Sequence, residues 1–366
     1  IMSKIKGSSI YTIVEGPTWT EAESNAIALG GHLVSINDAD EDNFVWENLG
    51  KTASYKGGEH NAYEANHVFI GATDKDQEGV WKWLDGSDMS YSNWQPGKPD
   101  GAPAYNGSVS GEDYLVYQAV NGVDGQGLYA GNWNDVRDEY YKEQLADSHI
   151  YGIAETPFIS RGDSAYVFVK GPTWEEAEAN ANKLGGHLVT INDQDENDWL
   201  VETFKDSNLS PYSEIYPDSD PNLDIYWMGL ELEDNSWRWS SGENLEYTNW
   251  GLTAPYGNGN RGQMILEKDP NNPNNWGGIA GKWNDQENDV INVYNGLGHN
   301  GIAEIKLAPN NAPTGDLVID GELKVGETIT IDLSNIDDLD NFDGWTPTYN
   351  YSWEVSTNNG RSWNAL

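Results

Sequence analysis

The sequence predicts a mixed α+β fold that occurs twice along the chain and is followed by a short segment of strands only. Three observations support this: a long internal repeat, segments of helical periodicity near the start of each repeat, and short aromatic strands separated by loops rich in Gly, Asn and Pro. Mixed helices and strands of this kind are typical of α+β domains. We therefore expect two helices, small antiparallel sheets and long loops in each repeat.

The internal repeat is long and close. The segment GPTWTEAESNAIALGGHLVSIND at 16–38 returns as GPTWEEAEANANKLGGHLVTIND at 171–193, and 18 of the 23 positions are identical. Later segments also return, such as GNWND at 131–135 and GKWND at 281–285. The first repeat therefore covers about residues 8–156 and the second repeat about 163–308. A period this long indicates two domains rather than a solenoid, and we expect boundaries at 1–157, 158–308 and 309–366.

Each repeat contains two helix signals. Thr18 with Glu21, and Thr173 with Glu176, have the spacing of a capping box, and the apolar residues that follow recur every three or four positions. A second capping pattern begins at Asp38 in the first repeat and returns in the second. We expect a helix to follow each of these signals, and a buried strand to lie between the two helices.

The residues after 308 have a different texture. Short runs such as DLVIDG, ETITIDLS and YNYSWEVS predict strands, and no helical period is visible. A β-sandwich of immunoglobulin type needs about seven strands, whereas only some four are visible before residue 366. We therefore expect a linker and a truncated β-sandwich at 309–366, within a longer multidomain protein.

The composition excludes several classes of function. The chain has 60 Asp and Glu against 20 Lys and Arg, a formal net charge of −40, so it lacks the basic surface that nucleic acid or an anionic membrane would require. It has no Cys, which excludes disulfides and thiolate metal sites. No run of 18 apolar residues predicts membrane insertion. An acidic surface suits cations that oxygen atoms coordinate, and no catalytic motif indicates an enzyme.

The segments TWTEAESNAIALGGHLVSI, FIGATDKDQEGVWKWLDGS, YSNWQPGKPD, GEDYLVY and GNWND occur in this order in the first repeat and return in outline in the second. In these segments the chain resembles tandem C-type lectin-like domains of the bacterial, disulfide-free type. The tail resembles the start of an immunoglobulin-like repeat of bacterial cell-surface adhesins. The resemblance implies an extracellular or cell-surface protein, in which packed Trp and Tyr side chains hold the long loops without disulfides.

The resemblance also implies a calcium site in the first repeat. Family members that bind sugar hold calcium with side chains on both sides of a cis proline, a later Glu, and a Trp-Asn-Asp segment. Carried over, these positions are Asp100, Glu112, Asn134 and Asp135, while Lys98 stands at the first position. Lysine has no acceptor atom, so one ligand is lost and a modified site is expected. The alternative is that Asn134 and Asp135 only stabilise a turn.

Two further expectations follow from the same resemblance. Asp74, Glu78 and Asp113, together with Glu112, match the acidic positions of an auxiliary calcium site, although the same segment could form a solvated turn. Tyr105 could stack on the face of a sugar, and Lys98 could pair with an anionic substituent of that sugar. The expected cofactor is Ca²⁺, and the expected partner is a glycan or another cell-surface ligand.

The second repeat departs from this pattern. Ala254 and Tyr256 flank Pro255, and we place Gln263 at the position of Glu112, so that only Asn284 and Asp285 remain from the ligand set. No calcium site for sugar is expected there. The leading hypothesis is thus a non-enzymatic, calcium-assisted carbohydrate-binding or adhesion module that acts through the loops of the first repeat. The alternative is a structural or protein-binding spacer that uses the fold without binding sugar.

Overall fold

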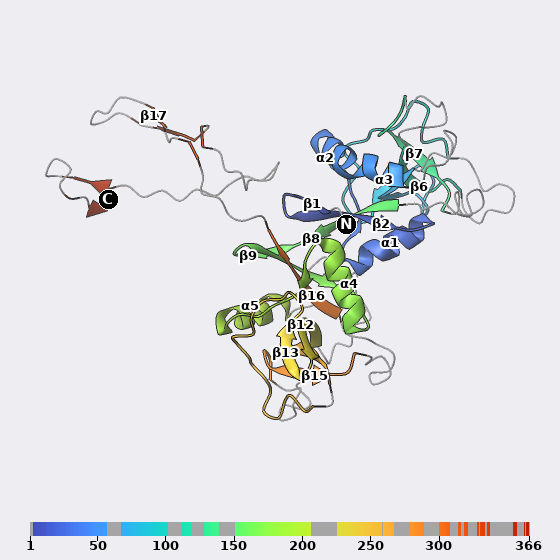
Figure 1. Ribbon diagram of the computed structural model, residues 1–366. Coiled ribbons are helices and arrows are strands. Elements are labelled where there is room, and N and C mark those ends of the chain that lie inside the picture. The colour runs from blue at the N-terminus through green and yellow to red at the C-terminus, as the bar shows by residue number, and fades with distance from the viewer. Residues whose placement is uncertain are drawn as a thin grey trace. The chain divides into compact units, whose positions relative to one another are not determined.

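The computed structural model shows two compact units, Ile1–Leu307 and Ala308–Leu366 (Figure 1). The first unit contains both repeats and the second contains the tail. The structure describes residues 3–56, 67–101, 111–118, 128–138, 151–205, 225–257, 259–266, 279–288 and 300–307, and short stretches of the tail at 314–315, 318–320, 328, 330–333, 335–336, 354–356, 362 and 364–365.

The first repeat folds around one eight-stranded sheet. Its strand order is β1-β2-β8-β4-β6-β7, with β3 added to β8 and β5 added to β4. β4 and β8 are parallel, so the sheet is mixed rather than one of several small antiparallel sheets. The strands are β1 (Ser3–Lys6), β2 (Ser9–Glu15), β3 (His32–Leu33), β4 (Val68–Thr73), β5 (Lys82–Trp83), β6 (Tyr114–Tyr117), β7 (Trp133–Val136) and β8 (Tyr151–Pro157).

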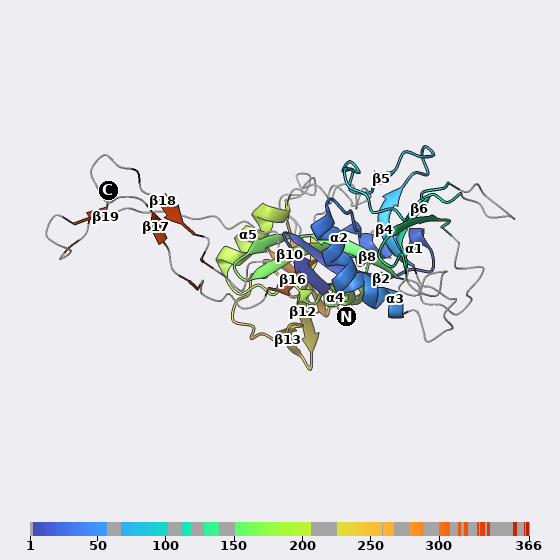
Figure 2. The ribbon, with the colours of Figure 1, turned by 90° about the horizontal axis from the view of Figure 1, so that it is seen from above.

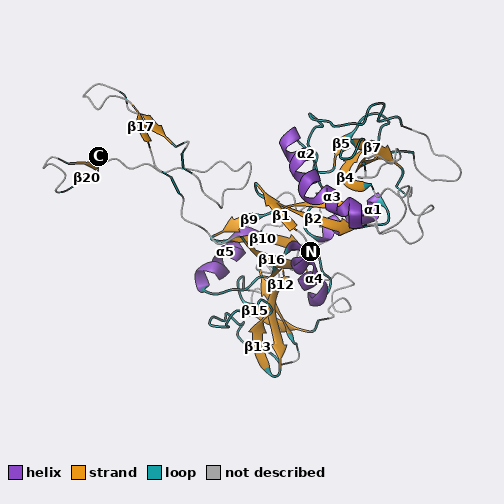
Figure 3. Ribbon diagram, turned by 45° about the horizontal axis from the view of Figure 1, so that its top comes forward, coloured by secondary structure: helices purple, strands orange, loops and turns teal. Residues whose placement is uncertain are grey.

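The second repeat builds the same sheet. Its order is β15-β14-β12-β16-β10-β9, with β11 added to β16 and β13 added to β12, and its parallel pair is β12 with β16. Each sheet draws its strands from one repeat (Figure 3). The strands are β9 (Ile159–Arg161), β10 (Ser164–Val169), β11 (His187–Leu188), β12 (Ile225–Glu233), β13 (Ser236–Trp239), β14 (Arg261–Ile265), β15 (Trp283–Gln286) and β16 (Asn300–Lys306).

The helices begin where the capping patterns predicted. α1 (Trp19–Ala28) starts after Thr18, whose hydroxyl accepts a hydrogen bond from the backbone N–H of Glu21. α4 (Trp174–Leu184) starts after Thr173 with a complete capping box. α1 packs along β2 and β8, and α4 packs along β16 in the same way (Figure 1).

The second helix differs between the repeats. It is one helix, α5 (Gln194–Phe204), in the second repeat. In the first repeat it continues from α2 (Ala39–Val45) through a π-helical turn at Trp46–Gly50 into α3 (Lys51–Lys56). The prediction of two helices thus holds for the described part of the second repeat, whereas the first repeat extends its second helix.

The regular elements among the described residues of the tail are strands. β17 (Val318–Asp320) pairs with β18 (Thr330–Asp332) in an antiparallel ladder, and these two strands lie side by side in Figure 2. β19 (Glu354–Val355) pairs with β20 (Asn364–Ala365) in a second ladder. These ladders agree with the predicted β content. The predicted sandwich stays a prediction.

Among the described residues, none of the helices has both the length and the apolar character needed to cross a membrane.

Candidate functional site

The loop that carries the predicted site contains a cis peptide bond. Lys98–Pro99 is cis, as expected, and so is Ala254–Pro255 at the corresponding place in the second repeat. The backbone of the first loop is tied to β7, because the N–H of Gln95 donates to the carbonyl of Trp133 at 2.9 Å. The turn around the proline is therefore a shared part of both repeats.

A fully buried tryptophan anchors each loop. The rings of Trp83, Tyr91 and Trp94 surround Trp133 edge-on, with centroids 5.6, 5.7 and 6.0 Å away. Three aromatic rings surround Trp283 at almost the same distances in the second repeat. This packing fulfils the expectation that aromatic side chains hold the loops of a chain without disulfides.

Three carboxylates converge in the first repeat. Oxygen atoms of Asp100, Glu112 and Asp135 lie within 4.8 Å of one another, the one such acidic group with metal-ligand spacing in the described part of the chain. Asp135 comes from β7 and its side chain is fully buried, while Glu112 precedes β6 and is 14% exposed. Asp100 follows the cis proline and is 51% exposed, so it forms the outer edge of the group.

The ammonium group of Lys98 lies among these carboxylates. Its Nζ donates to Asp100 Oδ1 at 2.6 Å and lies 3.6 Å from Asp135 Oδ1 and 3.9 Å from Glu112 Oε2. Burial disfavours its charge, but the hydrogen bond to Asp100 and the three negative charges together raise the pKa of Lys98. The chain thus supplies its own cation to the site.

The pKa values of the carboxyl groups reflect their positions. The hydrogen bond from Lys98 lowers the pKa of Asp100. Burial raises the pKa of Glu112, and the neighbouring charges of Asp135 and Asp100 add to this, although Lys98 acts in the opposite direction. Arg137 Nη2 lies 3.8 Å from Glu112 Oε1 and adds a second positive charge. Sequence reasoning missed Arg137, which directly follows the NWNDV segment.

The donor set has the chemistry that calcium requires. Calcium takes about six to eight oxygen ligands at about 2.3–2.6 Å, with a preference for carboxylates and amide carbonyls. Asp135 Oδ2 accepts the backbone N–H groups of Asp100 and Gly101, at 2.9 and 2.8 Å. Its Oδ1 and the Oδ1 of Asn134 are buried and lack a hydrogen-bond partner among the described residues. The oxygens therefore fit calcium, and the Lys98 ammonium is the group that does not.

The predicted auxiliary site is not assembled as an acidic group within the described residues. Asp74 Oδ2 accepts the N–H of Gly79 at 2.8 Å, and burial raises the pKa of Asp74. Glu78 is exposed and reaches toward the backbone of Gly101, while Asp113 is half-buried. This geometry is that of a turn held by Asp74, and the auxiliary calcium site stays a prediction. Tyr105 lies outside the described residues.

The second repeat corrects one sequence assignment. Gln263 pairs with Asn284 across the sheet, and in the first repeat the residue that pairs with Asn134 is Val116. Counting along the same strands places Gly259 at the position of Glu112. The assignment of Gln263 to that position was wrong, because the spacing of the two loops before the strand differs.

The corresponding site of the second repeat is closed by backbone. Asp285 accepts the N–H groups of Tyr256, Gly257 and Gly259 at 2.6, 3.0 and 3.2 Å. A Cβ added to Gly259 would come within 2.3 Å of the Gln286 nitrogen, so a side chain cannot fit there. Asn284 Oδ1 is buried without a hydrogen bond among the described residues here too. An unbonded amide oxygen therefore does not by itself mark a cation site.

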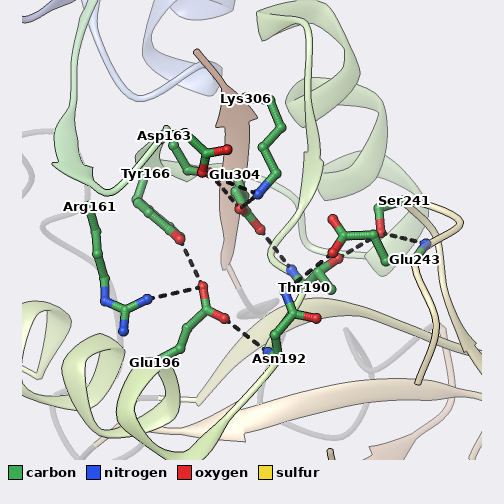
Figure 4. Close-up of polar contacts among 11 residues, drawn as sticks. Arg161, Asp163, Tyr166, Thr190, Asn192, Glu196, Ser241, Glu243, Glu304 and Lys306 are labelled. Carbon is green, nitrogen blue, oxygen red and sulfur yellow. Dashed lines mark hydrogen bonds and ion pairs between the residues drawn. The ribbon is translucent and has the colours of Figure 1, made fainter. Parts of the chain in front are cut away.

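A second polar cluster lies around a buried tyrosine in each repeat. In the second repeat, Tyr166 donates to Glu196 at 2.8 Å, Arg161 lies 3.7 Å from Glu196, and Lys306 lies 2.9 Å from Glu304 (Figure 4). Glu196 and Glu304 thus each have a positive charge nearby.

The first repeat has the same tyrosine and carboxylates but different neighbours. Tyr11 donates to Glu41 at 2.8 Å and to Glu155 at 3.3 Å. Pro157 replaces the lysine, and within the described part of the chain no ion pair reaches Glu155. Burial, with the charge of Glu41 beside it, raises the pKa of Glu155 to about 7.

Comparison with known proteins gives one family. The model of the Lectin C-type domain matches residues 15–118 and 170–292, one match in each repeat. The Bos taurus secretory phospholipase A2 receptor is 22% identical over 272 residues, which cover 70% of this chain and 16% of the receptor. The galactose-specific lectin nattectin of Thalassophryne nattereri is 35% identical over 95 residues, which cover 26% of this chain and 54% of the lectin.

Parts of solved structures are also similar to this chain. The cow C-type carbohydrate-recognition domain of CD23, crystallised in the presence of a GlcNAc2Man3 oligosaccharide, is 24% identical. The match covers 43% of this chain and 95% of that domain, with a TM-score of 0.29. This chain spans only about a sixth of the phospholipase A2 receptor, at 16% of its length.

Proposed function

Because this chain belongs to the Lectin C-type domain family, we propose that it is a carbohydrate-binding module whose ligand is held at the loops of the first repeat with the help of calcium. The observation that carries the proposal is the convergence of Asp100, Glu112 and Asp135 within 4.8 Å. Three formal negative charges at this spacing, one of them on the anchored loop, suit a divalent cation. The second repeat lacks such a group among its described residues.

The residues that would hold calcium are Asp100, Glu112, Asn134 and Asp135. Calcium, when bound, supplies open coordination positions for the hydroxyl oxygens of a sugar. The carboxylates at the rim can also accept hydrogen bonds from those hydroxyl groups. Lys98, once away from the carboxylates, can pair with an anionic substituent of the sugar. The backbone N–H groups that donate to Asp135 keep its carboxylate in place when Lys98 moves away.

We place this module outside the cell or at a cell surface, in a longer multidomain protein of the bacterial adhesin type, and we propose that it is not an enzyme. The absence of Cys supports the bacterial, disulfide-free type, because aromatic packing holds the loops here. The net charge of −40 disfavours nucleic acid as a partner. The strands of the tail agree with a further β domain.

A glycan array tests the proposal. The full chain is applied with calcium and again with a chelator, and Glu112→Gln serves as the site variant. Binding of a defined set of glycans with calcium, lost in chelator and in Glu112→Gln, is the expected result. Signal at background level in both conditions would refute it.

The second candidate function is a protein-binding or structural spacer. The closed site of the second repeat favours it, because Asp285 is saturated by backbone donors and Gly259 leaves no room for a carboxylate. Under this alternative the array is blank. Calcium then still binds the first repeat and stabilises it by mass action.

A further inference from the structure

We infer that Lys98 is a built-in competitor of calcium: its ammonium group fills the site, and calcium can enter only when that side chain leaves. This inference rests on the calcium site proposed above and concerns how that site is regulated. Under this inference, Lys98 sets the calcium concentration that the first repeat needs before it can bind its ligand.

The position of the ammonium group is the first argument. One Nζ atom lies between three carboxylates, at 2.6, 3.6 and 3.9 Å from their nearest oxygens. These carboxylates come from three separate segments of the chain, namely the cis-proline loop, the segment that precedes β6, and β7. The lysine side chain is 22% exposed, so it lies within the group rather than over its outer surface.

The two cations exclude one another. The ligand oxygens of the group lie within 4.8 Å of one another, which leaves room for one ion with calcium–oxygen distances of about 2.3–2.6 Å. Lysine offers donors and no acceptor, so it cannot serve as a ligand. A divalent ion beside an ammonium group at about 4 Å would also be strongly repelled.

The side chain has a way out. Its strongest partner, Asp100, is 51% exposed at the rim, and a four-carbon stem can carry the ammonium into solvent without a change of backbone. Asp135 cannot follow, because two backbone N–H groups hold its Oδ2. The exchange therefore moves one side chain and leaves the rest of the site in place.

The second repeat supplies an internal comparison. Ala254 stands at the position of Lys98, and Tyr256 and Gly259 stand at the positions of Asp100 and Glu112. The lysine is thus absent where the acids are absent. In this pair of repeats the positive charge accompanies the carboxylates, which is the pattern expected of a counter-ion.

Isothermal titration of the full chain with calcium alone tests the inference. Lys98→Met keeps the length of the stem and removes the charge, and Lys98→Gln also adds an acceptor. Both are expected to bind calcium at least about tenfold more tightly than the natural chain, since the ion pairs no longer have to be broken. Lys98→Arg keeps the charge and should stay within about twofold. Lys82→Met is the matched control, because it removes the same charge from an exposed position of β5.

Two additional measurements locate the effect. Adding Glu112→Gln to Lys98→Met should abolish the gain in calcium affinity. This result would assign the gain to this site rather than to another acidic part of the chain. Thermal unfolding in chelator should show Lys98→Met to be less stable than the natural chain, because three carboxylates lose their cation. Calcium should restore the lost stability.

The outcomes separate the inference from the proposed function. Equal calcium affinity in Lys98→Met and the natural chain, or an equal gain in Lys98→Arg, overturns the inference. A Lys98→Met chain that folds only with calcium supports it, and one that stays unfolded with calcium overturns it. Tighter calcium binding with a blank glycan array supports the inference and removes the proposed function. If glycan binding depends on calcium, and Lys98→Met changes neither this binding nor the calcium affinity, the proposed function is supported and the inference is overturned.

Discussion

The cis-proline loops of the two repeats have one backbone and two different sets of side chains. Both keep the cis bond, the buried tryptophan and an aspartate that accepts backbone N–H groups. They differ at three positions of the carboxylate group, where the first repeat has Lys98, Asp100 and Glu112. The residues that determine the backbone of the loop are thus kept in both repeats, while the residues that determine its charge differ.

The aspartates of the two loops show this most clearly. Asp285 accepts three backbone N–H groups and needs no cation. Asp135 accepts two, and its remaining oxygen faces Lys98 at 3.6 Å. The same residue at the same strand position is therefore a structural acceptor in one repeat and a member of the carboxylate group around Lys98 in the other.

The largest expected effect tests whether the scaffold is shared. Trp133→Ala and Trp283→Ala should each destabilise the protein by about 3–5 kcal/mol, because each removes a fully buried indole from an aromatic cluster. Denaturant unfolding followed by fluorescence measures this, with Leu252→Ala as a control because that side chain is fully exposed. A large loss of stability from only one of the two substitutions would contradict the shared scaffold.

The second prediction concerns pH and separates the polar clusters of the repeats. The pKa of Glu155 is raised from 4.5 to about 7, so the native state keeps a proton that the unfolded chain releases between these values. Stability therefore falls as pH rises through this window, by up to about 3 kcal/mol from this group. Burial lowers the pKa of His67 to about 4, which acts in the opposite direction over an overlapping window.

The difference between the natural chain and Glu155→Gln isolates that contribution. The variant should gain stability relative to the natural chain as pH rises from 4.5 to 7, measured by denaturant unfolding at several pH values. Glu304→Gln, the matched substitution in the second repeat, should lower stability at neutral pH, because Lys306 and Ser164 lose their partner. A pH-independent difference for Glu155→Gln would contradict the first expectation.

A smaller effect distinguishes the two aspartates. Asp285→Ala leaves three backbone N–H groups without their acceptor and should cost about 1–3 kcal/mol, with or without calcium. Asp135→Ala should also destabilise, and in addition it should abolish the rise in melting temperature that calcium causes. Thermal unfolding with calcium and with chelator provides the test. Retention of the calcium effect in Asp135→Ala would remove this residue from the site.

The smallest effect tests the equivalence of the helix starts. Thr18→Ala and Thr173→Ala each remove the side chain that caps the first helix of a repeat, and each should cost about 1 kcal/mol. Thermal or denaturant unfolding of both variants measures this, with Thr18→Ser and Thr173→Ser as controls that keep the cap. A cost in one repeat alone would show that the two helices are held by different means.

Much of this architecture could be predicted from local patterns. The helix starts after Thr18 and Thr173 follow from the capping patterns and are present. The cis bond before Pro99 and the aromatic anchors were expected from the family resemblance and are present too. The mixed sheet was not, since the parallel contact between β4 and β8 joins Val68 to Tyr151, far apart in the sequence. The misplacement of Gln263 has the same origin, because strand register depends on the partner strand.

The sequence by itself determined the repeat, the helix caps, the turns and the identity of the acidic residues, because these depend on side chains a few positions apart. Only the tertiary structure decided what the acidic residues do. Positions 98, 100, 112 and 135 meet because β6 and β7 pair and the anchored loop folds over them. The distance between the Lys98 ammonium and the carboxylates decides whether the lysine lies inside the group or outside it. Packing sets that distance.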